Sequence, residues 1–163
     1  MIKLTTYNEA VKDYSRNLYR YVVRSLKDDQ AAEDIVQDCF LKLWEHKEKI
    51  DWRKAKSWLF TCAHNAMVNY IKKDHRKVTL ENKAFIEPSI QTKHHFDVKE
   101  AIDKALDTLP EIQKSIVLLR DLEGYEYLEI GEILSLTESQ VKVYLFRARQ
   151  KMKEILKDIK MFV

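Results

Sequence analysis

The stretch "SLTESQVKVYLFRARQKM", residues 135–152, joins a polar opening to a segment that interleaves apolar and basic side chains. Thr137 can cap a helix and Gln140 follows three residues later, so the two can form a capping box. The inward stripe of that helix is Val141, Leu145, Ala148 and Met152. A short apolar helix at 126–134 precedes it, with room between them for a tight turn. This spacing predicts a helix-turn-helix motif.

Long polar and basic side chains are left on the outer side of the second helix. In a helix-turn-helix, this part of the second helix enters the major groove, where such side chains reach base edges and phosphates. An exposed Phe146 would contact a thymine methyl group or a sugar. A helical hairpin with a solvated basic side is the alternative, and the motif alone leaves it open. The candidate DNA-binding residues are Ser139, Gln140, Lys142, Val143, Phe146, Arg147, Arg149 and Gln150.

Charge changes sign near this turn, although the formal net charge of the chain is only +3. Residues 100–132 carry nine acids and three bases, whereas residues 137–163 carry seven bases and three acids. Such blocks are commonly solvated helix faces. The functional interpretation is that basic faces meet polyanions and acidic faces meet protein, which favours DNA binding by the last helix.

The composition of the 163-residue chain predicts an all-α protein, because it contains only two glycines and two prolines. No apolar run approaches the roughly 20 residues that span a bilayer, and the N-terminus lacks the apolar core of a signal peptide. We therefore expect a cytoplasmic protein with no membrane insertion. Cys39 and Cys62 are expected to be buried free thiols. The five histidines, including His94 and His95, form no metal-ligand pattern, so neither a metal nor a cofactor is expected.

Apolar residues recur at helical spacing in two parts of the chain, separated by a segment without that period. Three amphipathic helices are expected in the first part, near 6–28, 29–46 and 55–73, with Asp29 as the cap of the second. Helices near 97–109 and 110–123 precede the helix-turn-helix, and Gly124 is placed to end the second of them. The predicted fold is two small helical bundles joined by a linker. The boundaries are residues 1–76, 77–96 and 97–163.

Three quoted segments together resemble the extracytoplasmic-function sigma factors of bacteria. They are "AEDIVQDCFLKLW" (32–44), "KSWLFTCAHNAMVNYIKK" (56–73) and "LPEIQKSIVLLRDLEGYEYLEIGEILSLTESQVKVYLFRARQKMKEIL" (109–156), and they stand in family order over nearly the whole chain. The resemblance implies a promoter-specificity subunit of RNA polymerase, with a region 2 domain followed by a region 4 domain. Val143 and Tyr144 stand where relatives often carry a small polar and a basic residue.

The resemblance also implies partners and sites for both domains. The helix at 29–46 would dock on core RNA polymerase, and an exposed stripe for this contact is Asp34, Gln37, Asp38, Leu41 and Glu45. The last helix would read the minus-thirty-five element of promoter DNA. The turn and helix at 52–76 would read and melt the minus-ten element, because aromatic and basic side chains bind unstacked single strands. The residues implied are Trp52, Arg53, Lys56, Phe60, His64, Asn65, Asn69, Lys72, Lys73 and Arg76. An anti-sigma factor is a further expected partner.

Three other classes of protein compete with this interpretation. An enzyme would need convergent carboxylates, a metal cluster or an activated nucleophile, and the sequence offers none of these patterns. A stand-alone helix-turn-helix regulator would need no polymerase-docking stripe or single-strand-binding face in its first bundle. A helical adaptor that binds only protein would bind DNA weakly and without dependence on salt.

Overall fold

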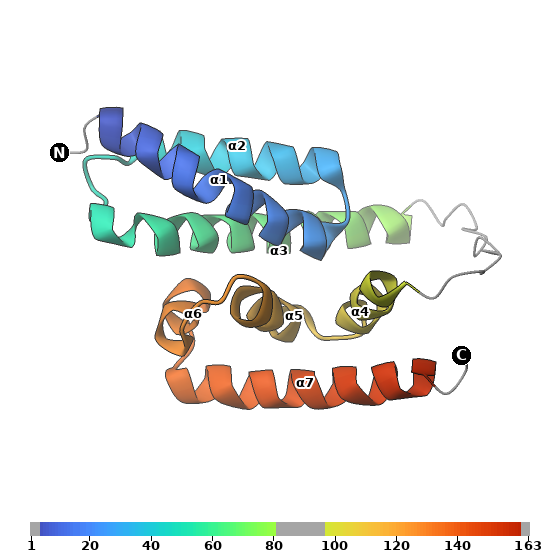
Figure 1. Cartoon of the computed structure of the whole chain (residues 1–163). Coiled ribbons are helices and arrows are strands. Elements are labelled where there is room, and N and C mark those ends of the chain that lie inside the picture. Colours follow the sequence, from blue (N-terminus) through green and yellow to red (C-terminus); the bar gives the residue numbers. More distant parts are fainter. Residues whose placement is uncertain (1–3, 81–96, 161–163) are drawn as a thin grey trace.

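The computed structural model describes residues 4–80 and 97–160, and all regular elements in these two ranges are helical (Figure 1). The predicted all-α class is therefore confirmed. The N-terminal bundle consists of α1 (Leu4–Leu26), α2 (Asp29–Glu45), the 3-10 turn η1 (Trp52–Lys54) and α3 (Ala55–Leu80). The C-terminal bundle consists of α4 (Val98–Asp107), α5 (Glu111–Val117), the π-helical stretch η2 (Leu118–Leu122), α6 (Tyr127–Leu134) and α7 (Glu138–Lys160).

A sharp turn joins α1 to α2 in the N-terminal bundle. Lys27 adopts a left-handed conformation with φ 56°, and Asp28 then caps α2 by accepting a hydrogen bond from the Ala31 amide at 3.0 Å. The Tyr70 hydroxyl of α3 donates to the same carboxylate at 2.7 Å. The hydrogen bond from the Ala31 amide has the larger effect and that from Tyr70 the smaller, and together they hold the pKa of Asp28 below its usual value. The cap is thus one residue before the predicted Asp29.

The predicted apolar stripes form the core of the N-terminal bundle. Leu18, Val22, Cys39, Leu43 and Leu59 are all buried. Helix α3 continues to Leu80, four residues beyond the point where helical periodicity was expected to end. The rest of the predicted linker, with His94 and His95, lies outside the described residues.

The helix-turn-helix is present with the predicted capping box. The Gln140 amide donates to the Thr137 side-chain oxygen at 3.1 Å, and the Gln140 side chain accepts from the Thr137 amide at 2.9 Å. Ser135 takes a left-handed conformation with φ 59°, which ends α6 in a sharp turn before α7. Gly131 lies against this turn, because a Cβ atom there would stand 2.5 Å from the Leu136 carbonyl oxygen.

The helix expected over residues 110–123 is divided into α5 and η2. At its end the Glu123 amide donates to the Leu118 carbonyl at 3.1 Å, a spacing of five residues rather than four. Gly124 then takes a positive φ of 73°, as its position predicted. Leu118 and Leu119 of η2 are buried, whereas Leu122 at its end is 42% exposed.

The two bundles pack directly against each other as stacked layers (Figure 1). Helices α5 and α6 lie between α3 and α7, so the C-terminal bundle covers one side of α3. The buried apolar cluster is continuous across this boundary, where the Phe60 and Tyr125 rings meet edge to face at 5.1 Å. The candidate surfaces for polymerase, the minus-ten element and the minus-thirty-five element therefore lie on two bundles that are packed together.

Candidate nucleic-acid and protein interfaces

The outer face of α7 carries the eight residues that the sequence assigns to duplex DNA, and all eight are exposed. Phe146 is 65% exposed, which is unusual for a large aromatic side chain within a well-packed bundle. Val141, Leu145 and Ala148 point inward and are buried. The helix therefore separates its packing side from its outer side as its period predicts.

Some polar groups on this α7 face are already engaged within the chain. The Gln140 side chain takes part in the capping box, and Lys142 pairs with Glu138 at 3.3 Å. Arg149 forms an ion pair with Asp121 of η2 that anchors α7 to the rest of the C-terminal bundle. Arg147 is exposed on the same face, so its guanidinium can reach an external acceptor.

The stripe on α2 is exposed along its whole length. Its members alternate acidic and polar groups around one apolar side chain, Leu41, which is 55% exposed. Asp38 pairs with Lys42 at 3.1 Å, with both side chains about half exposed. A mixture of this kind suits a protein partner, because the apolar centre is flanked by charges that can orient the contact. The exposed stripe is Asp34, Gln37, Asp38, Leu41 and Glu45.

An aromatic group beside this stripe was missed by the sequence analysis. Trp44 is 36% exposed and contacts the Tyr7 ring edge to face at 5.0 Å, while the Lys47 Nζ atom lies 3.3 Å from the centre of the Trp44 ring. Trp44 stands three residues after Leu41, so helical spacing was the available signal. Large aromatic side chains at the edge of an exposed stripe are typical of protein-binding surfaces.

The predicted minus-ten residues of α3 separate into two stripes. Asn65, Asn69, Lys72 and Arg76 follow one another at intervals of four, three and four residues and are exposed, as is Lys73. Lys56, Phe60 and His64 follow at intervals of four on another side of the helix. These three face the C-terminal bundle, through contacts with Glu129, Tyr125 and Ser115 respectively.

The expectation that Phe60 presents an aromatic surface to DNA is not met in this arrangement. Phe60 is fully buried between the rings of Tyr21 and Tyr125. His64 is half buried, with Nδ1 at 3.2 Å from the Tyr21 hydroxyl and 3.3 Å from the Ser115 hydroxyl. Burial lowers the pKa of His64 because it disfavours the charged imidazolium. The cover includes residues from the C-terminal bundle, which helical periodicity within α3 cannot predict.

The turn before α3 contributes a half-buried Trp52 and an exposed Arg53. The Arg53 side chain hydrogen bonds to the Asp51 carboxylate, which caps η1 through the Arg53 amide at 3.1 Å. The hydrogen bonds from Arg53 lower the pKa of Asp51. Trp52 packs against the core, whereas the Arg53 side chain is 90% exposed.

Both cysteines are free thiols, as expected, although Cys62 is half buried rather than fully buried. Hydrogen bonding to Cys62 and burial raise the pKa of Cys39. Within residues 4–80 and 97–160, no three His, Cys, Asp or Glu side chains gather in a way that could hold a metal ion. In the same ranges, no helix is both long enough and apolar enough to cross a membrane.

Comparison with known proteins identifies the family of both parts of the chain. Residues 10–77 match the family model described as Sigma-70 region 2, and residues 99–152 match that described as Sigma-70, region 4. The ECF RNA polymerase sigma factor SigM of Bacillus subtilis is 30% identical over 154 residues, which cover 92% of this chain and 94% of SigM. The chain belongs to the ECF sigma factor family. It is therefore a DNA-binding sigma factor, which directs the initiation of transcription, as the sequence predicted.

Other relatives of this ECF sigma factor support the same assignment. The RNA polymerase sigma factor YlaC of Bacillus subtilis is 26% identical, over 91% of this chain and 92% of YlaC. The crystal structure of RpoE in complex with the anti-sigma factor NepR, from Bartonella quintana, matches with a TM-score of 0.78 and 25% identity, over 94% and 98% of the two chains. CnrH in complex with the cytosolic domain of CnrY has the same fold, with a TM-score of 0.71 and 19% identity over 93% and 88%.

Proposed function

We propose that this ECF sigma factor binds core RNA polymerase through the exposed α2 stripe and positions it on a promoter with two separated elements. The region 4 part, residues 97–163, reads the minus-thirty-five element as duplex through the outer face of α7. The region 2 part, residues 1–76, captures the minus-ten element through α3 and the turn before it. Residues 77–96 join the two.

The observation that carries this proposal is that the α2 stripe and the α7 face are both exposed on one chain. A stand-alone helix-turn-helix regulator would need the α7 face alone. The match of residues 10–77 to a region 2 model favours the sigma factor over that alternative. The protein acts as a non-catalytic subunit in the cytoplasm, since sigma factors are not enzymes and the polymerase supplies the chemistry. An anti-sigma factor is a further proposed partner, because RpoE forms such a complex.

Polymerase docking is tested by co-elution of the purified protein with sigma-free bacterial core RNA polymerase at moderate salt. Asp38→Lys places a positive charge in the α2 stripe and is expected to weaken binding about tenfold or more. Glu33→Lys is the matched control, because Glu33 is an exposed acid of α2 outside the stripe. If Asp38→Lys bound as tightly as the wild type, the α2 stripe would not be the docking surface.

Promoter reading is tested by transcription with reconstituted holoenzyme from fragments that the holoenzyme itself selects. Arg147→Ala is expected to reduce transcription about tenfold, because a base-reading arginine contributes on the order of 1–3 kcal/mol. Lys157→Ala, an exposed cation at the far end of α7, is the control. Equal transcription by the Arg147→Ala variant and the wild type would remove α7 as the reading face.

A further inference from the structure

Helix α7 presents two apolar side chains to solvent on its outer face. Val143 is 46% exposed and Phe146 is 65% exposed. They stand three residues apart, so they are neighbours on one side of the helix. The core takes Val141 and Leu145 from another side of α7, and both of these are buried. We call Val143 and Phe146 the apolar pair.

The surroundings of the apolar pair are basic. Residues 137–163 carry seven bases and three acids. A protein partner for two apolar side chains among these cations would have to bring acids with its apolar surface. Duplex DNA brings phosphates for the cations and, on each thymine, an apolar methyl group in the major groove. The charge of this face therefore favours duplex DNA as its partner.

Several polar side chains of the same face are already engaged within the chain. The side chain of Gln140 accepts a hydrogen bond in the capping box at 2.9 Å. Lys142 pairs with Glu138 at 3.3 Å, and Arg149 pairs with Asp121 of η2. A base would have to displace an internal partner to be read by any of these three groups. The apolar pair needs no such exchange.

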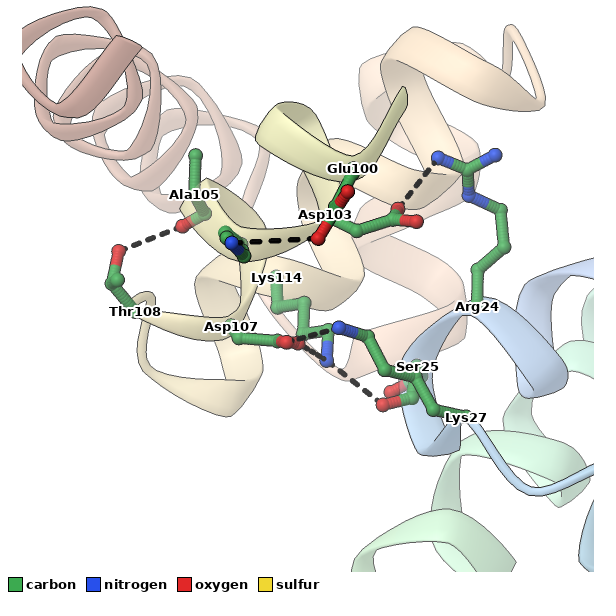
Figure 2. A network of polar contacts seen from close by, with 10 residues as sticks. Arg24, Ser25, Lys27, Glu100, Asp103, Ala105, Asp107, Thr108 and Lys114 are labelled. Atoms are coloured by element: carbon green, nitrogen blue, oxygen red, sulfur yellow. Dashed lines mark hydrogen bonds and ion pairs between the residues drawn. The ribbon is translucent and has the colours of Figure 1, made fainter. Parts of the chain in front are cut away.

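Basic side chains at the boundary between the two bundles are engaged more firmly still (Figure 2). Lys114 is 5% exposed, and its Nζ atom donates to the Ser25 carbonyl at 2.8 Å and to the Asp107 carboxylate at 2.9 Å. The same carboxylate accepts from Lys27, and this buried connection holds both cations inside the protein. Arg147 differs, because its exposed side chain has no ion pair or hydrogen bond among residues 4–80 and 97–160.

Helical geometry sets the apolar pair and Arg147 at neighbouring positions along the groove. With a rise of about 1.5 Å per residue, Val143 and Phe146 are separated by about 4.5 Å along α7. Base pairs of the duplex follow one another every 3.4 Å or about that. A recognition helix in the major groove would therefore set the two side chains against adjacent base pairs. Arg147 follows Val143 by one helical turn, so its guanidinium can reach a guanine edge or a phosphate beside them.

We propose that the apolar pair selects thymine methyl groups on two adjacent A·T pairs of the minus-thirty-five element, and that Val143 is the specificity-determining residue for one of them. This inference rests on the proposed reading of that element by α7. In the major groove, thymine presents a methyl group beside its carbonyl oxygen, and apolar side chains are the groups that contact it. Contact between Val143 and this methyl group removes apolar surface of both from water, which stabilises the complex.

Replacement of thymine by deoxyuridine tests this inference, because it removes the methyl group and keeps the hydrogen-bonding groups of the base. Holoenzyme reconstituted from core RNA polymerase and the full chain first selects duplexes from a pool randomised over the minus-thirty-five region. The selected sites should contain two adjacent A·T pairs. Each thymine of these pairs is then replaced singly by deoxyuridine, and binding of the holoenzyme is measured by competition. Deoxyuridine in the spacer between the two elements is the control.

Removal of either methyl group should weaken binding of the wild-type holoenzyme about fourfold, whereas the spacer substitution should leave it unchanged. Val143→Ala should weaken binding to the thymine duplex by a similar factor, and should lose the response to deoxyuridine at one of the two positions. Arg147→Ala is the matched variant on the same face. It should weaken binding to the thymine and deoxyuridine duplexes alike and keep the full response to both methyl groups.

The Val143→Ala variant should keep its fold, because Val143 is exposed and alanine has the higher helix propensity. Circular dichroism verifies this for both variants. A loss of binding in Val143→Ala with unchanged ellipticity is therefore a change at the DNA contact.

Contrary results separate this inference from the proposed function. If Arg147→Ala weakened binding but no deoxyuridine did, α7 would read DNA without methyl contacts and the inference would be wrong. A response of Val143→Ala to deoxyuridine at both positions, as in the wild type, would show that Val143 reads neither methyl group. If neither Arg147→Ala nor any deoxyuridine changed binding, α7 would not be the reading face, and the proposed function would fail together with the inference.

Discussion

Helices α7 and α3 both carry residues assigned to DNA, yet they present them differently. All eight α7 residues are exposed, whereas the α3 set divides into an exposed stripe and a covered one. Helix α7 is an outer layer of the molecule, while α3 is packed by its own bundle on one side and by the C-terminal bundle on another (Figure 1). Helical period therefore predicts which residues share a side, but not how many sides are covered.

Substitutions in the two α3 stripes should differ most in their effect on stability when the covered residue is Phe60. Phe60→Ala removes a fully buried ring from between two tyrosines, and we expect the free energy of unfolding to fall by about 3–5 kcal/mol. Asn69→Ala, on the exposed stripe, should change it by less than about 0.5 kcal/mol. Urea unfolding followed by circular dichroism measures both. Similar losses in the two variants would mean that the stripes are equally buried in solution.

Lys114 tests whether the contact between bundles contributes to stability. Lys114→Met keeps most of the apolar volume but leaves the Ser25 carbonyl and the Asp107 carboxylate without this donor. We expect a loss of about 2–3 kcal/mol in the same unfolding experiment. Lys104→Met removes an exposed cation that pairs with Glu100 one turn earlier, and serves as the control. A loss no larger than that of the control would contradict the buried connection.

Gly131 tests the tight turn that lets α7 present its outer face. Alanine at this position gains about 1 kcal/mol of helix propensity, but its Cβ atom would stand 2.5 Å from the Leu136 carbonyl oxygen. The atom in the way belongs to the backbone, which cannot move aside as a flexible side chain can. We therefore expect Gly131→Ala to lower the free energy of unfolding by about 1–2 kcal/mol in total. Leu128→Ala, at an exposed position of the same helix, is the control. Thermal unfolding that shows a more stable Gly131→Ala variant would mean that the turn relaxes freely.

His64 should give the smallest effect, visible as a dependence of stability on pH. Burial lowers the pKa of His64 in the folded state below its ordinary value near 6.5. At a pH between these two values, His64 is protonated in the unfolded chain but neutral in the folded chain. The stabilising contribution is therefore complete above about pH 6.5 and declines as the pH falls below it. Unfolding at pH 5.5 and 7.5 should show this decline in the wild type and a weaker one in His64→Gln. A decline of the same size in His64→Gln would mean that another group is responsible for the pH dependence.

Sequence reasoning was most successful where local rules decide the structure. The Thr137–Gln140 capping box and the left-handed Gly124 follow from residue types at fixed offsets. The order of the bundles and the family followed from motifs long enough to be specific. The role of Gly131 was not predictable, since helix propensity marks it as unfavourable, and the close approach of Leu136 that requires a glycine is a property of the folded turn.

By itself the sequence determined the helices, their apolar sides, the helix-turn-helix and membership of the ECF sigma factor family, because each depends on spacing and chemistry within a short segment. The acidic block at 100–132 indicated a surface that meets protein, but not which protein. Only the tertiary structure decided that its partner is the basic side of α1 and α3, and that Lys56, Phe60 and His64 lie beneath it. Residues 51 to 103 positions apart form these contacts, and no local pattern specifies such pairings.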